Sequence, residues 1–206
     1  SPASPTLGGT ITFSATVSGV VGASAPAGSI TWTISGAASS CTTTTPAAAG
    51  GAANQTIFTC AITAIPAGTY TATATYSGDS NYTSLASSAP VSVAIAKVSP
   101  TVVLTESGGG VIPSTLTFTA TVTGAAGVAP TDTAGGVNWL LSVPSGASGC
   151  TNAGSTTGTI SGGVTTYTCT ISATAYGTYI VSADYLGDVN FLEKVSNAVN
   201  VGISQN

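Results

Sequence analysis

Apolar and polar residues alternate along most of this chain with a period of two. Around residues 12–17, Phe13, Ala15 and Val17 share one side, while Thr and Ser occupy the other. Such alternation is typical of half-buried antiparallel strands, and no segment keeps the spacing of an amphipathic helix with capping residues. Further strands are predicted at Ile30/Trp32/Ile34, Phe58/Cys60/Ile62, Tyr70/Ala72/Ala74/Tyr76, Val91/Val93/Ile95, Phe118/Ala120/Val122, Val137/Trp139/Leu141, Tyr167/Cys169/Ile171, Tyr179/Val181/Ala183/Tyr185 and Val199/Val201/Ile203.

One internal repeat covers nearly the whole chain. Residues 11–19, Ile-Thr-Phe-Ser-Ala-Thr-Val-Ser-Gly, return at 116–124 as Leu-Thr-Phe-Thr-Ala-Thr-Val-Thr-Gly, and Gly68–Tyr82 returns as Gly177–Phe191. A fixed strand order with small loop insertions indicates a duplicated domain. We therefore predict an all-β protein of two tandem antiparallel β-sandwiches, residues 1–97 and residues 98–206, with about seven strands each.

The first copy lacks a counterpart to the first strand of the second copy. Thr101–Thr105 precedes the repeated segment in copy two, whereas the first ten residues of the chain align with the loop that follows that strand. An absent strand leaves an open sheet edge with unpaired backbone groups. Three explanations stay open: the chain is a piece of a longer array, the edge is tolerated or covered by the N-terminal residues, or a neighbouring molecule supplies the strand.

The composition excludes several classes of function. The chain has no His, so the usual general base and the commonest metal ligand are missing. Two basic residues against six acidic ones leave no basic patch for nucleic acid. No Ser or Thr has a neighbouring base to activate it, and no run approaches the ~18 apolar residues of a spanning helix. We expect no enzymatic activity, no cofactor, no nucleic-acid partner and no membrane span.

The four cysteines allow three disulfide pairings. The spacing from Cys41 to Cys60 equals that from Cys150 to Cys169, and the repeat maps one pair onto the other. The duplication therefore predicts the disulfides Cys41–Cys60 and Cys150–Cys169. Two metal-binding thiol pairs are the alternative, although CxxC spacing and His are both missing. Disulfides indicate an oxidising, extracellular compartment, and we interpret the chain as a mature or excised segment of a secreted protein.

A Gly-Asp-x-Asn sequence occurs once in each copy and is the most conspicuous polar motif. Its side-chain oxygens could contribute to a calcium site, but Ca²⁺ takes six to eight oxygens and no other acid repeats alongside. The favoured interpretation is a turn in which Asp and Asn bond to their own backbone. The weak calcium candidates are Asp79, Asn81, Asp188 and Asn190.

Two further surface features accompany the turns. Asn54-Gln-Thr56 and Asn81-Tyr-Thr83 match the N-glycosylation pattern, so Asn54 and Asn81 are candidate glycan sites. Outward threonines on two predicted strands of copy one could form a carbohydrate-binding ladder. Copy two interrupts this ladder, which favours a simple preference of threonine for strands. The threonines are Thr31, Thr33, Thr69, Thr71, Thr73 and Thr75.

The motifs Thr12–Val17, Ala67–Tyr70 and Tyr76–Tyr82, each with a partner in copy two, resemble the bacterial immunoglobulin-like domains that occur in tandem on surface proteins and adhesins. The resemblance implies immunoglobulin-like β-sandwiches, export, and a spacer or adhesive role, with no shared catalytic site. The cysteine spacing departs from the core disulfide of antibody domains. Trp32 and Trp139 are expected to be core anchors, and Tyr70 and Tyr179 to be tyrosine-corner residues.

These features together predict a non-catalytic structural protein at the cell surface or outside the cell. It would be a building block of a surface stalk, an adhesin or an extracellular fibre, with β-strand complementation as one hypothesis for filament assembly. Its expected partners are neighbouring immunoglobulin-like domains or copies of itself. The alternative is a module that binds surface carbohydrate or protein through the loops at one end of a sandwich.

Overall fold

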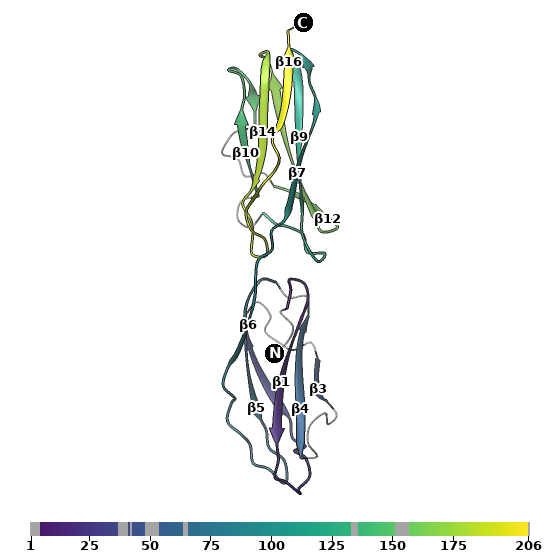
Figure 1. Cartoon of the computed structure of the whole chain (residues 1–206), viewed down its shortest axis with the longest axis vertical. Helices are drawn as coiled ribbons and strands as arrows, with labels where there is room; N and C mark the ends of the chain where they lie inside the picture. Colours follow the sequence, from purple (N-terminus) through teal and green to yellow (C-terminus); the bar gives the residue numbers. More distant parts are fainter. Residues whose placement is uncertain are drawn as a thin grey trace. The chain divides into compact units, whose positions relative to one another are not determined.

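Every regular element in the computed structural model is a β-strand, and the chain divides into two units, Ser1–Ala96 and Lys97–Asn206 (Figure 1). The structure describes residues 5–36, 41, 43–47, 54–63, 66–132, 136–150 and 157–205. Each unit contains two sheets, as the alternating pattern predicts, and the all-β immunoglobulin-like fold class is confirmed. Within these described residues no helix is long and apolar enough to cross a membrane.

Unit 1 consists of two three-stranded antiparallel sheets, ordered β1-β4-β3 and β2-β5-β6. In the first sheet, β1 pairs with β4 along its whole length, from Thr10 opposite Thr63 to Ser18 opposite Gln55. The strands are β1 (Thr10–Ser18), β2 (Ile30–Ser35), β3 (Thr43–Ala47), β4 (Gln55–Thr63), β5 (Gly68–Tyr76) and β6 (Val91–Ile95).

Unit 2 repeats this plan with added strands, in two five-stranded sheets. One has the order β11-β13-β9-β7, with β12 also paired to β13; the other has the order β10-β14-β16-β8, with β15 also paired to β14. The strands are β7 (Thr101–Gly108), β8 (Gly110–Val111), β9 (Ser114–Thr123), β10 (Val137–Ser142), β11 (Ser148–Gly149), β12 (Thr159–Ser161), β13 (Val164–Ala173), β14 (Gly177–Tyr185), β15 (Lys194–Val195) and β16 (Val199–Ser204).

The core lies between the two sheets of each unit and follows the predicted alternation in most strands. Alternate side chains of β9 are completely buried, namely Leu116, Phe118, Ala120 and Val122, while the threonines between them stay partly accessible. Burial of branched and aromatic side chains stabilises each unit by roughly 1.5–3 kcal/mol for each large residue.

Two core expectations hold only in part. Trp139 is fully buried, whereas Trp32 is partly accessible and lies between two separate clusters of buried side chains. In β6, Ile95 is buried but Val91 is 57% exposed, so the last strand of unit 1 does not bury all three of its predicted core residues. Both departures lie in unit 1, whose described residues form fewer strands than those of unit 2.

The two units differ most at the strand that the sequence indicates is absent. In unit 2, β7 pairs antiparallel with β9 from Thr101 opposite Thr123 to Gly108 opposite Leu116. In unit 1 the equivalent strand β1 pairs with β4 alone, and residues 5–9, the described part before it, form no strand. The edge of β1 is therefore open over the described residues, and its outward backbone groups have no strand partner.

Tyrosine hydroxyls hold the loop that leads into the longest strand of each unit. The Tyr70 hydroxyl donates to the carbonyl of Pro66 at 2.9 Å, and the Tyr179 hydroxyl donates to the carbonyl of Ala175 at 2.8 Å. Both rings are fully buried. The prediction of a tyrosine corner in each unit is confirmed.

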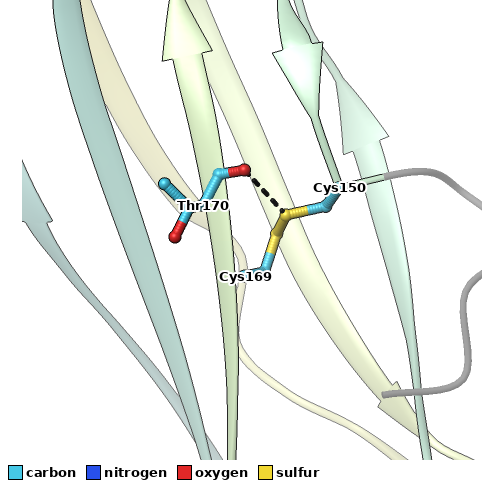
Figure 2. Close-up of a disulfide and its surroundings, with 3 residues drawn as sticks. All are labelled: Cys150, Cys169 and Thr170. Atoms are coloured by element: carbon cyan, nitrogen blue, oxygen red, sulfur yellow. Dashed lines mark hydrogen bonds between the residues drawn. A yellow bond between two sulfur atoms is a disulfide. The ribbon is translucent and has the colours of Figure 1, made fainter.

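Each unit has one disulfide, with the pairing that the duplication predicts. Cys41 is bonded to Cys60 with their Cα atoms 5.2 Å apart, and Cys150 to Cys169 with theirs 5.7 Å apart. Cys169 is buried on β13, while Cys150 follows β11 at the edge of the same sheet; Figure 2 shows the Cys150 sulfur beside the Thr170 carbonyl, 3.4 Å away. The bonds thus fasten a sheet edge to its neighbouring strand.

We expect removal of one disulfide to weaken only the unit that contains it. Closing a loop of this size stabilises a fold by up to about 3 kcal/mol in the chain-entropy model. Replacing both Cys150 and Cys169 with alanine should therefore lower the unfolding free energy of unit 2 by about 2 kcal/mol. Calorimetry of the full chain would resolve the two units. The matched pair Cys41→Ala with Cys60→Ala is the control for unit 1, and an unchanged unit 2 transition would contradict the expectation.

Candidate functional site

The Gly-Asp-x-Asn turn of unit 1 is organised by the carboxylate of Asp79. Its Oδ1 accepts hydrogen bonds from the main-chain N–H groups of Asn81 at 2.7 Å and Tyr82 at 2.9 Å. Its Oδ2 accepts from the N–H of Ala27 at 2.6 Å and from the Tyr76 hydroxyl at 2.8 Å. The turn is closed by a bond from the Asp79 N–H to the Tyr82 carbonyl. One carboxylate therefore fixes its own turn and fastens it to the loop before β2.

The turn of unit 2 has the same construction around Asp188. Its Oδ1 accepts from the N–H groups of Asn190 at 2.7 Å and Phe191 at 2.8 Å. Its Oδ2 accepts from the N–H of Thr131 at 2.7 Å and the Thr131 hydroxyl at 2.9 Å. Asp188 is 4% exposed, and the Nζ of Lys97 donates to its main-chain carbonyl. The counterpart of Tyr76, Tyr185, lies at the same site, and its hydroxyl donates to the Thr131 carbonyl at 3.1 Å.

Glycine is required at the first position of both turns. Gly78 and Gly187 each have φ of +79°, in the left-handed region that side chains rarely adopt. A Cβ atom on Gly78 would also lie 2.7 Å from the Ser84 nitrogen. In both motifs the glycine directly precedes the aspartate. Its left-handed backbone turns the chain so that the aspartate carboxylate can accept hydrogen bonds from the N–H groups that follow.

Hydrogen bonding favours the charged form of both carboxylates. The N–H groups of Ala27 and Asn81 lower the pKa of Asp79 from 3.8 to about 2. Burial raises the pKa of Asp188, but the hydrogen bonds from Thr131, Asn190 and Phe191 outweigh burial, and the pKa of Asp188 is lowered. Both side chains are therefore ionised throughout the neutral pH range and act only as acceptors.

The arrangement suits a structural brace, because both oxygens of each carboxylate already accept hydrogen bonds. Both oxygens of Asp79 and of Asp188 point at N–H or O–H donors, whose hydrogens carry positive charge toward the carboxylate. The weak calcium candidates Asn81 and Asn190 contribute main-chain donors to these turns. No group of three or more His, Cys, Asp or Glu that could hold a metal occurs in the described ranges.

The aromatic residue that ends each turn is placed differently in the two units. Tyr82 is partly accessible, and its hydroxyl donates to the Ser24 carbonyl at 2.7 Å. Phe191, its counterpart, is fully buried. Without a hydroxyl the Phe191 ring gains nothing from solvent contact, and it packs inward. Neither ring forms an open stacking platform for sugar.

Sequence reasoning missed one acidic residue that joins the network of unit 2. Asp132 Oδ1 accepts from the Tyr167 hydroxyl at 2.5 Å, and Asp132 Oδ2 accepts from the Gly158 N–H at 2.9 Å. Burial first, then this hydrogen bond, raises the pKa of Tyr167, which stays a protonated donor. Unit 1 has Gly28 where unit 2 has Asp132, so the repeat contained no signal for this contact.

The two glycosylation candidates have different surroundings. Asn54 is partly buried, and its Nδ2 donates to the Gly19 carbonyl at 2.7 Å, while the Gly19 N–H donates to the Asn54 carbonyl. Asn81 is exposed at the tip of the turn, with a contact of 3.4 Å from its Nδ2 to the Ser24 hydroxyl. The amide of Asn81 is therefore the more accessible of the two.

The model of one protein family matches the first unit. Residues 1–96 match the model of the family described as bacterial Ig-like domain (group 3), which confirms the resemblance noted in the sequence. No curated protein matches the chain.

Three solved structures illustrate the similar folds that were found. The fibronectin(III)-like modules of Clostridium thermocellum CbhA are 19% identical with a TM-score of 0.28, over 100% of this chain and 92% of that chain. A marsupial T cell receptor is 15% identical with a TM-score of 0.35, over 98% and 71%. Domains 5–6 of the S-layer protein SbsC are 14% identical with a TM-score of 0.28, over 98% and 93%.

The carboxylate braces predict a specific loss of stability in acid. In the folded chain the pKa of Asp79 is lowered from its ordinary value of 3.8 to about 2. The carboxylate therefore contributes its stabilisation above that ordinary value, and this stabilisation is lost as the pH falls toward about 2. Asp79→Asn should therefore lower the melting temperature of unit 1 at pH 7 but have little effect near pH 2. Calorimetry at both pH values checks this, with Ser80→Ala in the same turn as the control.

The buried brace of unit 2 permits a rough magnitude. Hydrogen bonds to a charged group contribute about 1.5–3 kcal/mol, so Asp188→Asn should destabilise unit 2 by about 2 kcal/mol at neutral pH. Chemical denaturation of the full chain measures this, and Val189→Ala, which alters an exposed side chain of the same turn, is the control. Equal stability of the two variants would contradict a bracing role.

Accessibility of the amide predicts unequal glycan occupancy at the two acceptor sequences. In a host that attaches N-linked glycans to secreted proteins, Asn81 should be modified to a much larger extent than Asn54, whose amide is engaged in the fold. Peptide mapping by mass spectrometry gives the occupancy of each, and Thr83→Ala is the control that removes the Asn81 acceptor. Preferential modification of Asn54 would contradict the prediction.

Proposed function

We propose that this chain, whose first unit matches the bacterial Ig-like domain family, is a non-catalytic structural module of an extracellular or cell-surface protein. It serves as a building block of a surface stalk, adhesin or extracellular fibre. Its neighbours associate with it by adding a strand to the open edge of β1. These neighbours are immunoglobulin-like domains or further copies of the chain.

The observation that carries the assembly proposal is the difference between two equivalent strands. β9 has a partner on each side, whereas β1 pairs only with β4 over the described residues. An open edge presents alternating N–H and C=O groups, and β-augmentation satisfies them with a strand from elsewhere. Edge strands are commonly protected against such pairing by charged side chains. β1 carries no charged side chain.

The remaining polar chemistry supports a structural role. The Asp79 and Asp188 carboxylates, the tyrosine-corner hydroxyls and the hydroxyls of Thr56 and Thr165 all bond within their own unit. A disulfide in each thin-cored unit suits an oxidising environment, where small domains rely on such bonds. These groups stabilise the fold of their own unit.

The threonine face of unit 1 favours binding of carbohydrate as a second candidate function. Thr31 lies opposite Thr75 and Thr33 opposite Thr73 on the β2–β5 pair, and Thr31 and Thr33 are exposed. Such a neutral surface with regularly spaced hydroxyls could bond to a glycan. In unit 2, Leu140 and Ile180 are exposed on the corresponding face, so the feature belongs to one unit only.

Light scattering over a concentration series, with negative-stain electron microscopy, tests the structural proposal. We expect the purified chain to associate into regular filaments, because the open edge permits head-to-tail contacts that do not close. Thr16→Glu, which places a charge on the exposed face of the β1 edge, should abolish association, whereas Thr33→Glu on the other sheet should not. A monodisperse chain at every concentration would contradict self-assembly, and saturable glycan binding lost in Thr33→Glu would favour the second candidate.

A further inference from the structure

The sequence contains two bonds that a protease specific for basic residues can attack, and one of them joins the two units. Arg is absent, and the two basic residues are Lys97 and Lys194. Hydrolysis after Lys97 separates residues 1–97 from residues 98–206, whereas hydrolysis after Lys194 removes only residues 195–206. The Lys97–Val98 peptide bond, called here the junction bond, is therefore the point at which such a protease would part the units.

The main chain that follows the junction bond is fastened to the aspartate turn of unit 2. The Val98 N–H donates to the Asn190 carbonyl at 3.0 Å, and the Leu192 N–H donates to the Val98 carbonyl at 3.0 Å. Val98 thereby forms a parallel β-bridge with Phe191. The nitrogen of the junction bond is thus engaged in β-type pairing, and Val98 leaves the turn only if both of these hydrogen bonds break.

The lysine side chain is held by the same turn. Lys97 is exposed, but its Nζ donates to the main-chain carbonyl of Asp188. Proteases of the trypsin type bind the basic side chain of their substrate in a pocket that contains an aspartate. Lys97 enters such a pocket only after it leaves the Asp188 carbonyl. Main chain and side chain must therefore both come away from the turn before the junction bond reaches a catalytic site.

The Asp188 carboxylate keeps the turn in the shape that receives the junction. Its Oδ1 holds the N–H groups of Asn190 and Phe191, and the Asp188 N–H donates to the Phe191 carbonyl at 3.0 Å. The Asn190 carbonyl that accepts from Val98 lies within this closed turn. Loosening the carboxylate therefore loosens the partners of the junction bond.

We propose that the junction bond is a masked cleavage site for a lysine-specific protease of the trypsin type, and that the aspartate turn of unit 2 is the mask. Cleavage adds one water molecule across the bond. The Lys97 carbonyl carbon gains the hydroxyl to form a carboxyl group, and the Val98 nitrogen gains the hydrogen to form a free amine. This control of cleavage goes beyond the proposed structural role and does not depend on self-association.

The mask opens by local release of the turn, with the sheets still folded. The contacts that hold the junction are hydrogen bonds to one turn, whereas unfolding of unit 2 breaks the pairing of β7 with β9 and of β9 with β13. Local openings of this kind require less free energy than global unfolding. Cleavage follows the population of the open form when opening and closing are fast.

Limited digestion of the full chain with trypsin, followed by mass spectrometry, measures cleavage at the junction through the fragments 1–97 and 98–206. A Val21→Lys chain is the reference for an unmasked lysine, because Val21 is 90% exposed in the loop after β1. The bond after this new lysine should be cut about a hundredfold faster than the junction bond of the same chain. Equal rates at the two bonds would overturn the mask.

Two variants that weaken unit 2 in different places test whether the turn controls cleavage. Asp188→Asn should speed cleavage at the junction by about tenfold or more, because it weakens hydrogen bonds to a charged group. The matched control replaces both Cys150 and Cys169 with alanine, which destabilises unit 2 to a similar extent but leaves the turn intact. It should leave junction cleavage unchanged. An equal increase in both variants would mean that cleavage requires global unfolding and would overturn the inference.

The urea dependence of cleavage gives an independent measurement on the parent chain. Local opening exposes little surface, so the rate at the junction should change little at urea concentrations well below the unfolding midpoint. A peptide with the sequence of residues 93–102 corrects for the effect of urea on the protease itself. A dependence as steep as that of unfolding would contradict local release of the turn. That outcome would leave the proposed structural role of the chain unchanged.

Discussion

Pairing of backbone groups at the sheet edges is the constraint on which both units depend. A strand buried on one face can leave water only if its N–H and C=O groups have partners. Unit 2 meets this requirement for β9 by placing β13 on one side and β7 on the other. Unit 1 meets it for β1 on one side only, over the residues that are described. Ala15 and Trp32 are only partly buried in unit 1, whereas their counterparts Ala120 and Trp139 are buried in unit 2.

The thin cores explain why so many polar groups have structural tasks. Aromatic residues make up 6% of the chain, and much of each core consists of Ala, Val and Ile side chains. Small side chains contribute less transfer free energy each, so local fastenings matter more. The disulfide, the tyrosine corner and the aspartate brace each fix a loop to a strand at a different point. Together they reduce the freedom of segments that the core alone would hold weakly.

The braces extend the turn that the repeated motif predicts, because each carboxylate also bonds to a distant loop. A Gly-Asp-x-Asn sequence is compatible both with calcium ligands and with a hydrogen-bonded turn, and its residues are the same in the two cases. Only the positions of the donors distinguish the two, because Ala27 and Thr131 come from loops about fifty residues away. Once these donors are in place, the carboxylate is fully occupied. Its low pKa then reflects hydrogen bonding to its charged form.

The sequence by itself determined the longer strands, the duplication and the disulfide pairing. These are local or symmetric properties: side-chain alternation has a period of two, and one copy serves as a template for the other. Tertiary structure alone decided that Phe191 is buried, that Asp132 holds Tyr167, and that Val91 lies outside the core. Each of these depends on contacts between segments far apart in the chain, and Phe191 and Asp132 also stand at positions where the two copies differ. Neither strand periodicity nor internal symmetry contains information about such contacts.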